Sequence, residues 1–352
     1  MDNTYFIFSD QIIEIERFHL CTWEFKNSSA LVEIGCEIST ESLPRNSSSF
    51  KIGLYIPWLR QQNITTDLFP RLKDSANSKF IFNDSVVNTF SFDGGRGVLG
   101  VIHEFQGRPP LCILPVALTF DYEKKKIEVI VDLTAYNNNT KNTNIYFRFS
   151  IVANLNLISI RKKGLGRSTL IYDQKINEGR NLPDHLFGEL QSKQLCSIRS
   201  CFCFNIVPNS YDLSFLDSSS LKNVRTLEFD AFNRYLEDKR VQKDQLMVVF
   251  SKKNYGESFS FFSIFIEERI GAGQFALAIL INLISGILLF LPSYRTQNRF
   301  GFNSTEFWMQ LPIEVYIAIF IGLLLILYFI WPTLTSTVNN MRSWKIFKRK
   351  SK

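Results

Sequence analysis

Basic residues and glycines alternate over one short segment of the chain, Arg161-Lys162-Lys163-Gly164-Leu165-Gly166-Arg167-Ser168. Glycine lets a backbone approach a ligand closely, and guanidinium and ammonium groups donate charge-assisted hydrogen bonds to phosphate oxygens. The segment predicts an anion site for a nucleotide or a single-stranded nucleic acid backbone, formed by Arg161, Lys162, Lys163 and Arg167. A solvated loop between two strands has the same composition, and this alternative stays open.

A second glycine-rich segment, Asp93-Gly94-Gly95-Arg96-Gly97, has the composition of a nest of backbone N–H groups around an anion. A tight turn between two strands requires the same glycines, because glycine adopts positive φ angles without steric cost. The turn needs no ligand, and both interpretations stay open.

The remaining reactive side chains form no motif that is typical of an enzyme. The chain has no nucleophile elbow, no phosphate-loop lysine motif, no dinucleotide fingerprint and no zinc-binding histidine–glutamate motif. His19, His103 and His185 are far apart in the sequence, and the six cysteines have neither zinc-site nor redox-pair spacing. We expect a protein that is not an enzyme and holds no metal or cofactor, with six reduced, mostly buried thiols.

Polar and small residues recur within an apolar stretch near the carboxyl end of the chain. Steps of four, four and three to four place them on one face of a helix: Gln274, Ala278, Asn282, Ser285 and Gly286. An asparagine at mid-membrane is costly when it faces lipid, so this face should contact protein or water. It is either the seam or pore of a homo-oligomer, or a packing seam between two helices of one chain.

The polar face lies within the first of two long apolar stretches of the chain. Residues 271–291 carry no charged side chain, and residues 313–331 carry only Glu314, at their edge. About 20 apolar residues in a helix cross the hydrocarbon core of a bilayer. The sequence therefore predicts a transmembrane hairpin, with helices at 271–291 and 313–331 and a short loop at 292–312.

Positive charge predicts the orientation of this hairpin. From Pro292 onward the chain has eight basic and two acidic residues, so +6 of the net charge of +7 lies at this end. Most of it is in the tail at 332–352, at residues that include Arg342, Lys345, Lys348, Arg349 and Lys350. Basic residues accumulate on the cytoplasmic side and attract anionic lipids.

The amino-terminal residues do not resemble a secretory signal, which agrees with a cytosolic start of the chain. We therefore expect a multi-pass protein of a bacterial inner membrane, with membrane lipids as partners. The amino-terminal domain and the basic tail would lie in the cytoplasm, and the loop at 292–312 would lie in the periplasm.

Residues 1–266 are expected to form one cytosolic sensor or binding domain that is mainly β, sandwich-like, with one or two helices. Apolar and polar side chains alternate within 32–38, 50–56, 127–133 and 145–155, which predicts strands, and further strands are expected at 201–207, 246–252 and 258–266. The polar segment 137–142 predicts a turn that joins the strands at 127–133 and 145–155 into a hairpin. One apolar face predicts a helix near 221–242.

This organisation resembles the two-helix transmembrane effectors of bacterial anti-phage systems, of the retron or nucleotide-signalling type. The resemblance lies in the spans at 271–291 and 313–331, the basic tail at 342–352 and an Asn-, Lys-, Phe- and Ile-rich composition. It implies a homo-oligomer that permeabilises the inner membrane on infection, under a nucleotide, nucleic-acid or ribonucleoprotein regulator. The alternatives are a membrane-anchored binding or scaffold protein without a pore, and a membrane-bound enzyme of unknown fold.

Overall fold

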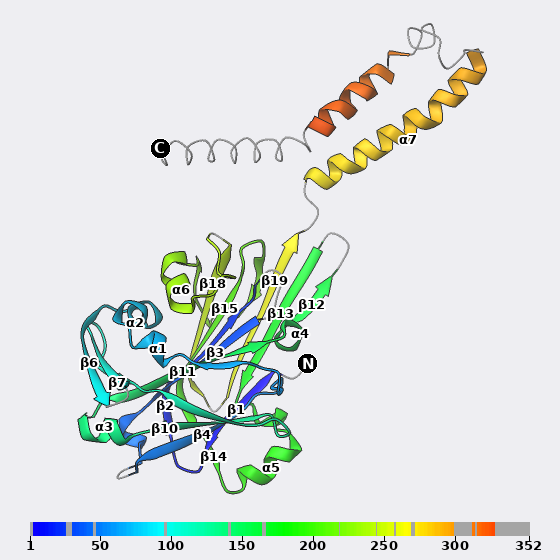
Figure 1. Ribbon diagram of the computed structural model, residues 1–352. Coiled ribbons are helices and arrows are strands. Elements are labelled where there is room, and N and C mark those ends of the chain that lie inside the picture. The colour runs from blue at the N-terminus through cyan, green and yellow to red at the C-terminus, as the bar shows by residue number, and fades with distance from the viewer. Residues whose placement is uncertain are drawn as a thin grey trace, which may run out of the picture. The chain divides into compact units, whose positions relative to one another are not determined.

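A computed structural model of the chain is shown in Figure 1. The structure describes residues 3–25, 30–44, 47–94, 97–139, 142–163, 167–217, 219–243, 245–256, 258–268, 272–298, 312–313 and 315–327. The chain forms two compact units. The β unit comprises Met1–Gly164 and Ser168–Glu267, and the helical unit comprises Leu165–Arg167 and Glu268–Lys352.

Two sheets make up the β unit. The first sheet has the strand order β16 (Asp212–Leu216), β19 (Phe259–Glu268), β13 (Arg167–Ile176), β1 (Thr4–Ser9), β4 (Ser49–Tyr55), β10 (Lys126–Asp132) and β9 (Val116–Asp121), with β12 (Ile160–Lys163) beside β13 and β14 (Gln194–Leu195) beside β1. The second sheet has the order β17 (Leu221–Thr226), β18 (Leu246–Gly256), β15 (Ser197–Pro208), β2 (Glu14–Trp23), β3 (Ala30–Ile38), β11 (Asn144–Ala153), β8 (Leu111–Ile113), β7 (Gly97–Phe105) and β6 (Val86–Gly94), with β5 (Thr65–Asp67) beside β11.

Short helices connect these strands. They are α1 (Phe69–Leu72), α2 (Ser75–Phe82), α3 (Thr134–Asn139), α4 (Leu155–Ile158), α5 (Asp184–Leu190) and α6 (Phe229–Leu236), with 3-10 turns at Thr40–Ser42 and Gly179–Asn181. The expectation of one or two helices in this region was therefore too low. Segments of four to eight residues are too short to show the apolar periodicity of a longer helix.

The two sheets share one hydrophobic core. Alternate side chains of the second sheet, such as Leu20, Ile34 and Phe147, are fully buried in the same cluster as Ile52 and Val129 of the first sheet. Each such side chain contributes roughly 1.5–3 kcal/mol when it leaves water. The mainly β, sandwich-like fold class is confirmed, and strands cover each of the seven predicted ranges wholly or nearly so.

The predicted hairpin of 127–133 with 145–155 is wrong. β10 pairs with β4 and β9 in the first sheet, whereas β11 pairs with β3, β5 and β8 in the second. Helix α3 covers residues 137–139 of the polar segment 137–142, between a strand of the first sheet and a strand of the second. Alternation shows that a strand buries one face, but it does not show which strand lies beside it.

The predicted helix at 221–242 is wrong in its first third. Residues Leu221–Thr226 form the edge strand β17, paired with β18, and helix α6 covers only Phe229–Leu236. Leu221 and Val224 fit the spacing of a helix. As a strand, however, this segment forms hydrogen bonds with the backbone N–H and C=O groups of β18, which need partners.

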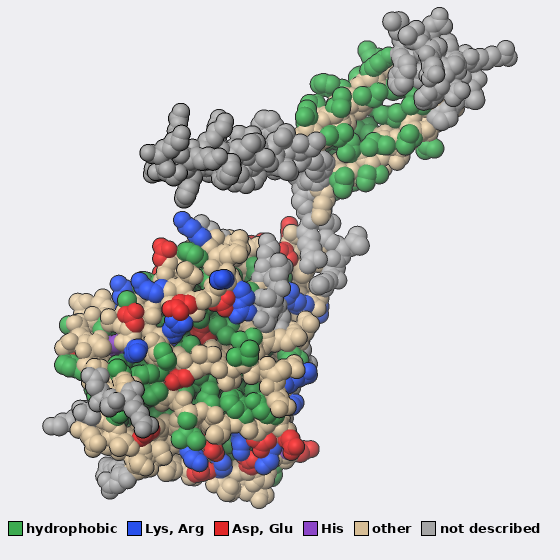
Figure 2. Space-filling model, viewed as in Figure 1, with side chains coloured by type: hydrophobic (Ala, Val, Ile, Leu, Met, Phe, Trp, Pro, Cys, Tyr) green, Lys and Arg blue, Asp and Glu red, His purple; other side chains and the backbone are tan. Residues whose placement is uncertain are grey.

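The helical unit contains the long helix α7, Ala272–Asn298, which passes the predicted end at Leu291. Its segment Gln274–Leu291 is long and apolar enough to cross a membrane, and a shorter apolar helix covers Val315–Leu327. Figure 2 shows the described surface of both helices covered mainly by hydrophobic side chains. A second helix of spanning length is not shown, because residues 328–331 and most of the predicted loop lie outside the described residues.

All six cysteines lie in the β unit and are free and buried. Burial raises the pKa of each thiol, to about 12 for Cys196. A protonated, enclosed thiol is a weak nucleophile, so these residues behave as small core side chains.

Candidate functional site

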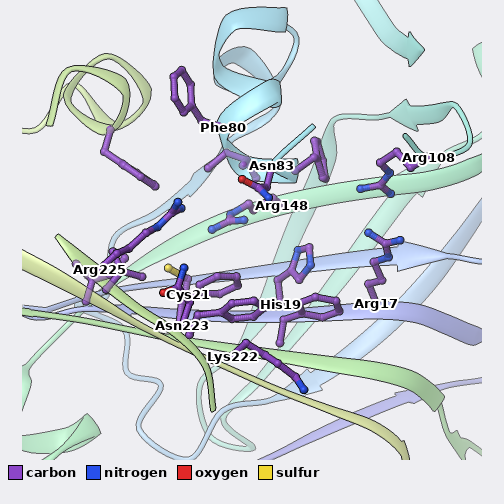
Figure 3. Close-up of a pocket in the computed structure, with 18 residues that line it drawn as sticks. Arg17, His19, Cys21, Phe80, Asn83, Arg108, Arg148, Lys222, Asn223 and Arg225 are labelled. Atoms are coloured by element: carbon purple, nitrogen blue, oxygen red, sulfur yellow. The ribbon is translucent and has the colours of Figure 1, made fainter. Parts of the chain in front are cut away.

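A pocket of about 410 Å³ lies on the outer face of the second sheet, entirely within the β unit (Figure 3). Its lining comes from β2, β11, β15, β17 and β18, from helices α2 and α6, and from Arg108, which precedes β8. Five basic side chains line it, together with several phenylalanines, and none of its described lining residues is acidic: Arg17, Arg108, Arg148, Lys222 and Arg225 are the basic ones.

Strand alternation places the polar residues of β2 in this pocket. Phe18 and Leu20 fill the core between the sheets, so Arg17, His19 and Cys21 must point to the outer face.

The strand register aligns His19 with Gly35 on β3, and Gly35 with Arg148 on β11. A Cβ atom on Gly35 would lie 2.9 Å from Cζ of Tyr146, so glycine leaves the room that the Tyr146 and Arg148 side chains occupy.

A buried carboxylate fixes Arg148 at the back of the pocket. Nε and Nη2 of Arg148 lie 2.7 and 2.5 Å from Oε2 of Glu33, and the Tyr235 hydroxyl donates to the same oxygen at 3.0 Å. The Trp23 indole N–H donates to the other oxygen of Glu33 at 2.8 Å. These contacts compensate the charges of Glu33 and Arg148, so Arg148 contributes donors and shape rather than net charge.

The second carboxylate behind the pocket, Glu37, is shared by two arginines. Its Oε2 lies 2.8 Å from Nη2 of Arg108 and 3.5 Å from Nε of Arg17, and Figure 3 shows both side chains extending toward the same region. One positive charge is therefore left over.

The Arg108 side chain is only 8% exposed, yet its Nε and Nη1 atoms have no hydrogen-bond partner among the described residues. Unsatisfied buried donors cost about 1–3 kcal/mol each. The Arg108 guanidinium also lies over the rings of Phe82 and Phe105, at 5.0 and 5.1 Å from their centroids.

His19 lies in the centre of this arrangement and is neutral. Burial lowers its pKa well below 6.5, and the charges of Arg148, Arg17 and Arg108 lower it further. Its Nδ1 lies 2.9 Å from the Tyr146 hydroxyl, and its ring meets the edge of Phe202 at 4.9 Å. A proton on His19 would face three guanidinium groups, so an anion is the species that this environment favours.

Aromatic side chains form the other wall. The ring of Phe250 is parallel to those of Phe204 and Phe202, at centroid distances of 4.6 and 5.9 Å. Beside them, the pKa of Lys252 is lowered by burial and then by the charges of Arg17 and Lys222. The pocket therefore combines positive potential with an apolar ring surface, which suits an organic anion.

The basic segment predicted as an anion site lies elsewhere, and none of its residues lines this pocket. Arg161 and Lys162 belong to strand β12, and Arg161 is ion-paired with the buried Glu24, whose other oxygen accepts a 2.5 Å hydrogen bond from Tyr172. Lys163 ends β12, and Arg167 is an exposed residue at the start of β13. The guanidinium of Arg161 thus has a structural partner, and residues 164–166 lie outside the described residues.

In the other glycine-rich segment, Gly94 ends β6, Gly97 begins β7, and these two glycines pair with each other. Residues 95 and 96 lie outside the described residues. Within the described part of the chain, no group of three His, Cys, Asp or Glu side chains comes together as a metal site requires.

The five residues of the polar face on α7, Gln274, Ala278, Asn282, Ser285 and Gly286, are all exposed. A different stripe, Ala276, Leu280, Leu283 and Ile287, is partly buried. Leu280 lies close to Gly322 of the shorter helix, so this stripe is the one that meets it.

Asn282 and Gly286 lie at the edge of this contact, in a shallow groove shared with Pro312, Val315 and Ala318. The basic tail residues Arg342, Lys345, Lys348, Arg349 and Lys350 lie outside the described residues.

The pocket was not predicted from the sequence, because its residues come from distant segments that only the sheet register aligns. The available signal was the set of polar residues between core residues: Arg17 and His19 in β2, Glu33 and Glu37 in β3, and Arg148 in β11. Buried polar groups require partners, so such a set predicts a polar cluster on one sheet face.

In comparisons with known proteins, no protein-family model matches this sequence and no curated protein matches it.

Proposed function

We propose that this protein is a ligand-responsive effector of the bacterial inner membrane. The β unit faces the cytoplasm and receives an anionic trigger in the outer-face pocket, after which the helical unit oligomerises and permeabilises the membrane. Following the resemblance to two-helix effectors, we assign this activity to anti-phage defence, in which permeabilisation stops the growth of an infected cell. The protein acts by binding rather than by catalysis.

The polar face of α7 is the observation that carries this proposal. A segment of spanning length exposes Gln274, Asn282 and Ser285 along one side. The shorter helix contacts a different stripe and reaches only the edge of this side, at Asn282 and Gly286. Polar side chains that face lipid are costly, so this side favours contact with further copies of α7 or with water. Contact with further copies would hold the polar residues at the centre of an oligomer, where they would line a path for ions.

The short connection between the units supports transmission of a signal. β19 ends at Glu268 and α7 begins at Ala272, so three residues join the last strand of the β unit to the membrane helix. β19 itself is held in the first sheet by β13 and β16. A rearrangement that moves this sheet would be passed on without a slack tether.

The test follows the membrane potential of bacteria that produce the full chain while they are infected with a panel of phages. Wild-type protein should depolarise the membrane early in a productive infection, before the phage lyses the cell. Asn282→Leu should abolish or strongly delay depolarisation, because it removes the polar group at the middle of the face. Leu288→Ile changes an exposed apolar residue of the same helix and should behave as wild type.

Two outcomes contradict the proposal. One is a membrane potential that never changes in cells producing the wild-type protein. The other is depolarisation of equal extent and timing in the wild type and in variants of every residue of the polar face.

A membrane-anchored binding protein without a pore is the second candidate, and the groove at Asn282 and Gly286 favours it. This groove brings part of the polar face against the shorter helix of the same chain. Under this alternative, replacing residues 272–331 by an unrelated two-span anchor should preserve function, whereas the effector proposal requires that function is lost.

A further inference from the structure

Arg108 marks the place in the pocket where an anion would bind. Its side chain is more than nine-tenths buried, yet Nε and Nη1 have no acceptor among the described residues. Only Nη2 is used, by the carboxylate that Arg17 shares. Each of these two unused guanidinium nitrogens can donate a charge-assisted hydrogen bond to a phosphate oxygen.

The charge around this place is not balanced. Arg17 and Arg108 have one carboxylate between them, Glu37, and Arg148 is balanced by Glu33. Lys222 lines the same pocket from β17 and makes no ion pair within the described part of the chain. A ligand with one or two negative charges would neutralise this excess.

The rest of the lining suits a flat ring with polar edges. Phe80 of α2 and Phe232 of α6 face the pocket together with the parallel rings of Phe202, Phe204 and Phe250. Aromatic faces stack with nucleobases of any sequence.

Two amides stand at the exposed rim, on Asn83, the carboxyl-terminal cap of α2, and on Asn223 of β17 (Figure 3). Neither amide is hydrogen-bonded to another described side chain or backbone group. An amide offers both a donor and an acceptor, which is what the edge of a base requires. An inorganic anion would leave the rings and amides unused, and an aliphatic acid would leave the amides unused.

We infer that this pocket binds a nucleotide, with its phosphate on Arg108, Arg17 and Lys222 and its base against the phenylalanines, within reach of Asn83 and Asn223. The volume of about 410 Å³ is within the range of roughly 300–1,000 Å³ that small-molecule sites occupy. The inference rests on the proposed function only in making this nucleotide the trigger, since the binding site itself is complete within the β unit.

The experiment measures binding to the purified full chain in detergent by isothermal titration calorimetry. The probes are adenosine monophosphate, guanosine monophosphate, adenosine and inorganic phosphate. At least one monophosphate should bind about 10-fold more tightly than both adenosine and phosphate, because only a monophosphate contacts both the basic side chains and the phenylalanine rings. The inference would be overturned if neither monophosphate bound more tightly than phosphate, if neither bound more tightly than adenosine, or if no probe bound.

Variants locate the site. Arg108→Gln should weaken monophosphate binding by about 10-fold or more, and Lys222→Glu, at the exposed rim where folding is not at risk, should also weaken it. Arg180→Gln removes an exposed arginine that does not line the pocket and should bind as wild type.

The double variant Lys162→Glu with Lys163→Glu tests the β12–β13 segment as the alternative anion site. If this double variant lost monophosphate binding while Lys222→Glu bound as wild type, the assignment of the nucleotide to the pocket would be overturned. Nucleotide binding without depolarisation would contradict the proposed function but support the nucleotide site. Depolarisation without nucleotide binding would support the proposed function but contradict the nucleotide site.

Discussion

His19 shows how a single residue in the pocket depends on its neighbours. Its folded-state pKa lies well below 6.5 because of burial first and then because of Arg148, Arg17 and Arg108. In the unfolded chain this histidine takes up a proton near its ordinary pKa of about 6.5, whereas the folded protein resists it. The unfolded state therefore binds more protons below this pH, and the free energy of unfolding should fall as the pH falls.

The measurement compares wild type with His19→Gln, which retains a hydrogen-bonding side chain beside Tyr146. Urea unfolding of the β unit within the full chain, followed by tryptophan fluorescence to which the buried Trp23 and Trp58 contribute, gives the pH dependence. Below about pH 6.5 the wild type should lose up to about 1.4 kcal/mol per pH unit more than the variant. Equal slopes would mean that folded His19 accepts the proton.

At the scale of elements, helix α2 holds Phe80, Ile81 and Phe82 against the pocket and depends on its amino-terminal cap. The Asp74 carboxylate accepts a hydrogen bond of 2.9 Å from the Ala76 N–H. Asp74→Ala should destabilise the β unit by about 1 kcal/mol, because it leaves a helix N–H unsatisfied. Denaturant unfolding measures this loss.

Asp74→Asn is the matched control, since asparagine caps a helix about as well as aspartate. A loss of stability in this variant equal to that of Asp74→Ala would show that the charge of Asp74, rather than its cap, is what stabilises α2.

Which strands exist was predictable from local pattern, and which strands are neighbours was not. Ile127, Val129 and Val131 alternate as a half-buried strand must, yet the same pattern fits pairing with β11 as well as with β4. The same limit hid the site, because Arg17, Arg148 and Lys222 meet only through the register of the second sheet. The polar face of α7 was visible because helical periodicity is local to one segment.

At the scale of the whole molecule, the helical unit should hold the chain in a membrane, whereas the β unit without it should not bind one. The described surface of α7 is mostly apolar, whereas charged side chains are scattered over the β unit (Figure 2). The full chain should remain in the membrane fraction through an alkaline wash, and a chain ending at Glu268 should stay in the supernatant. Paired Ile281→Asp and Ile284→Asp changes should release the full chain, because each aspartate costs about 2.5–3.5 kcal/mol at the centre of a span.

Orientation is tested on the same material. Protease added to intact spheroplasts should leave the β unit uncut, and the same protease should cut it after lysis. Cleavage in intact spheroplasts would place the β unit in the periplasm and contradict a cytoplasmic trigger.

The burial of all six cysteines has a practical consequence for following the protein at work. A maleimide dye or spin label added to the folded wild type should leave these enclosed, protonated thiols unlabelled. One new cysteine at an exposed position, such as Ile64→Cys, would then carry the only label without any prior removal of native cysteines. Energy transfer or dipolar spectroscopy on such singly labelled copies would count the subunits in each assembly in a bilayer before and after a nucleoside monophosphate is added.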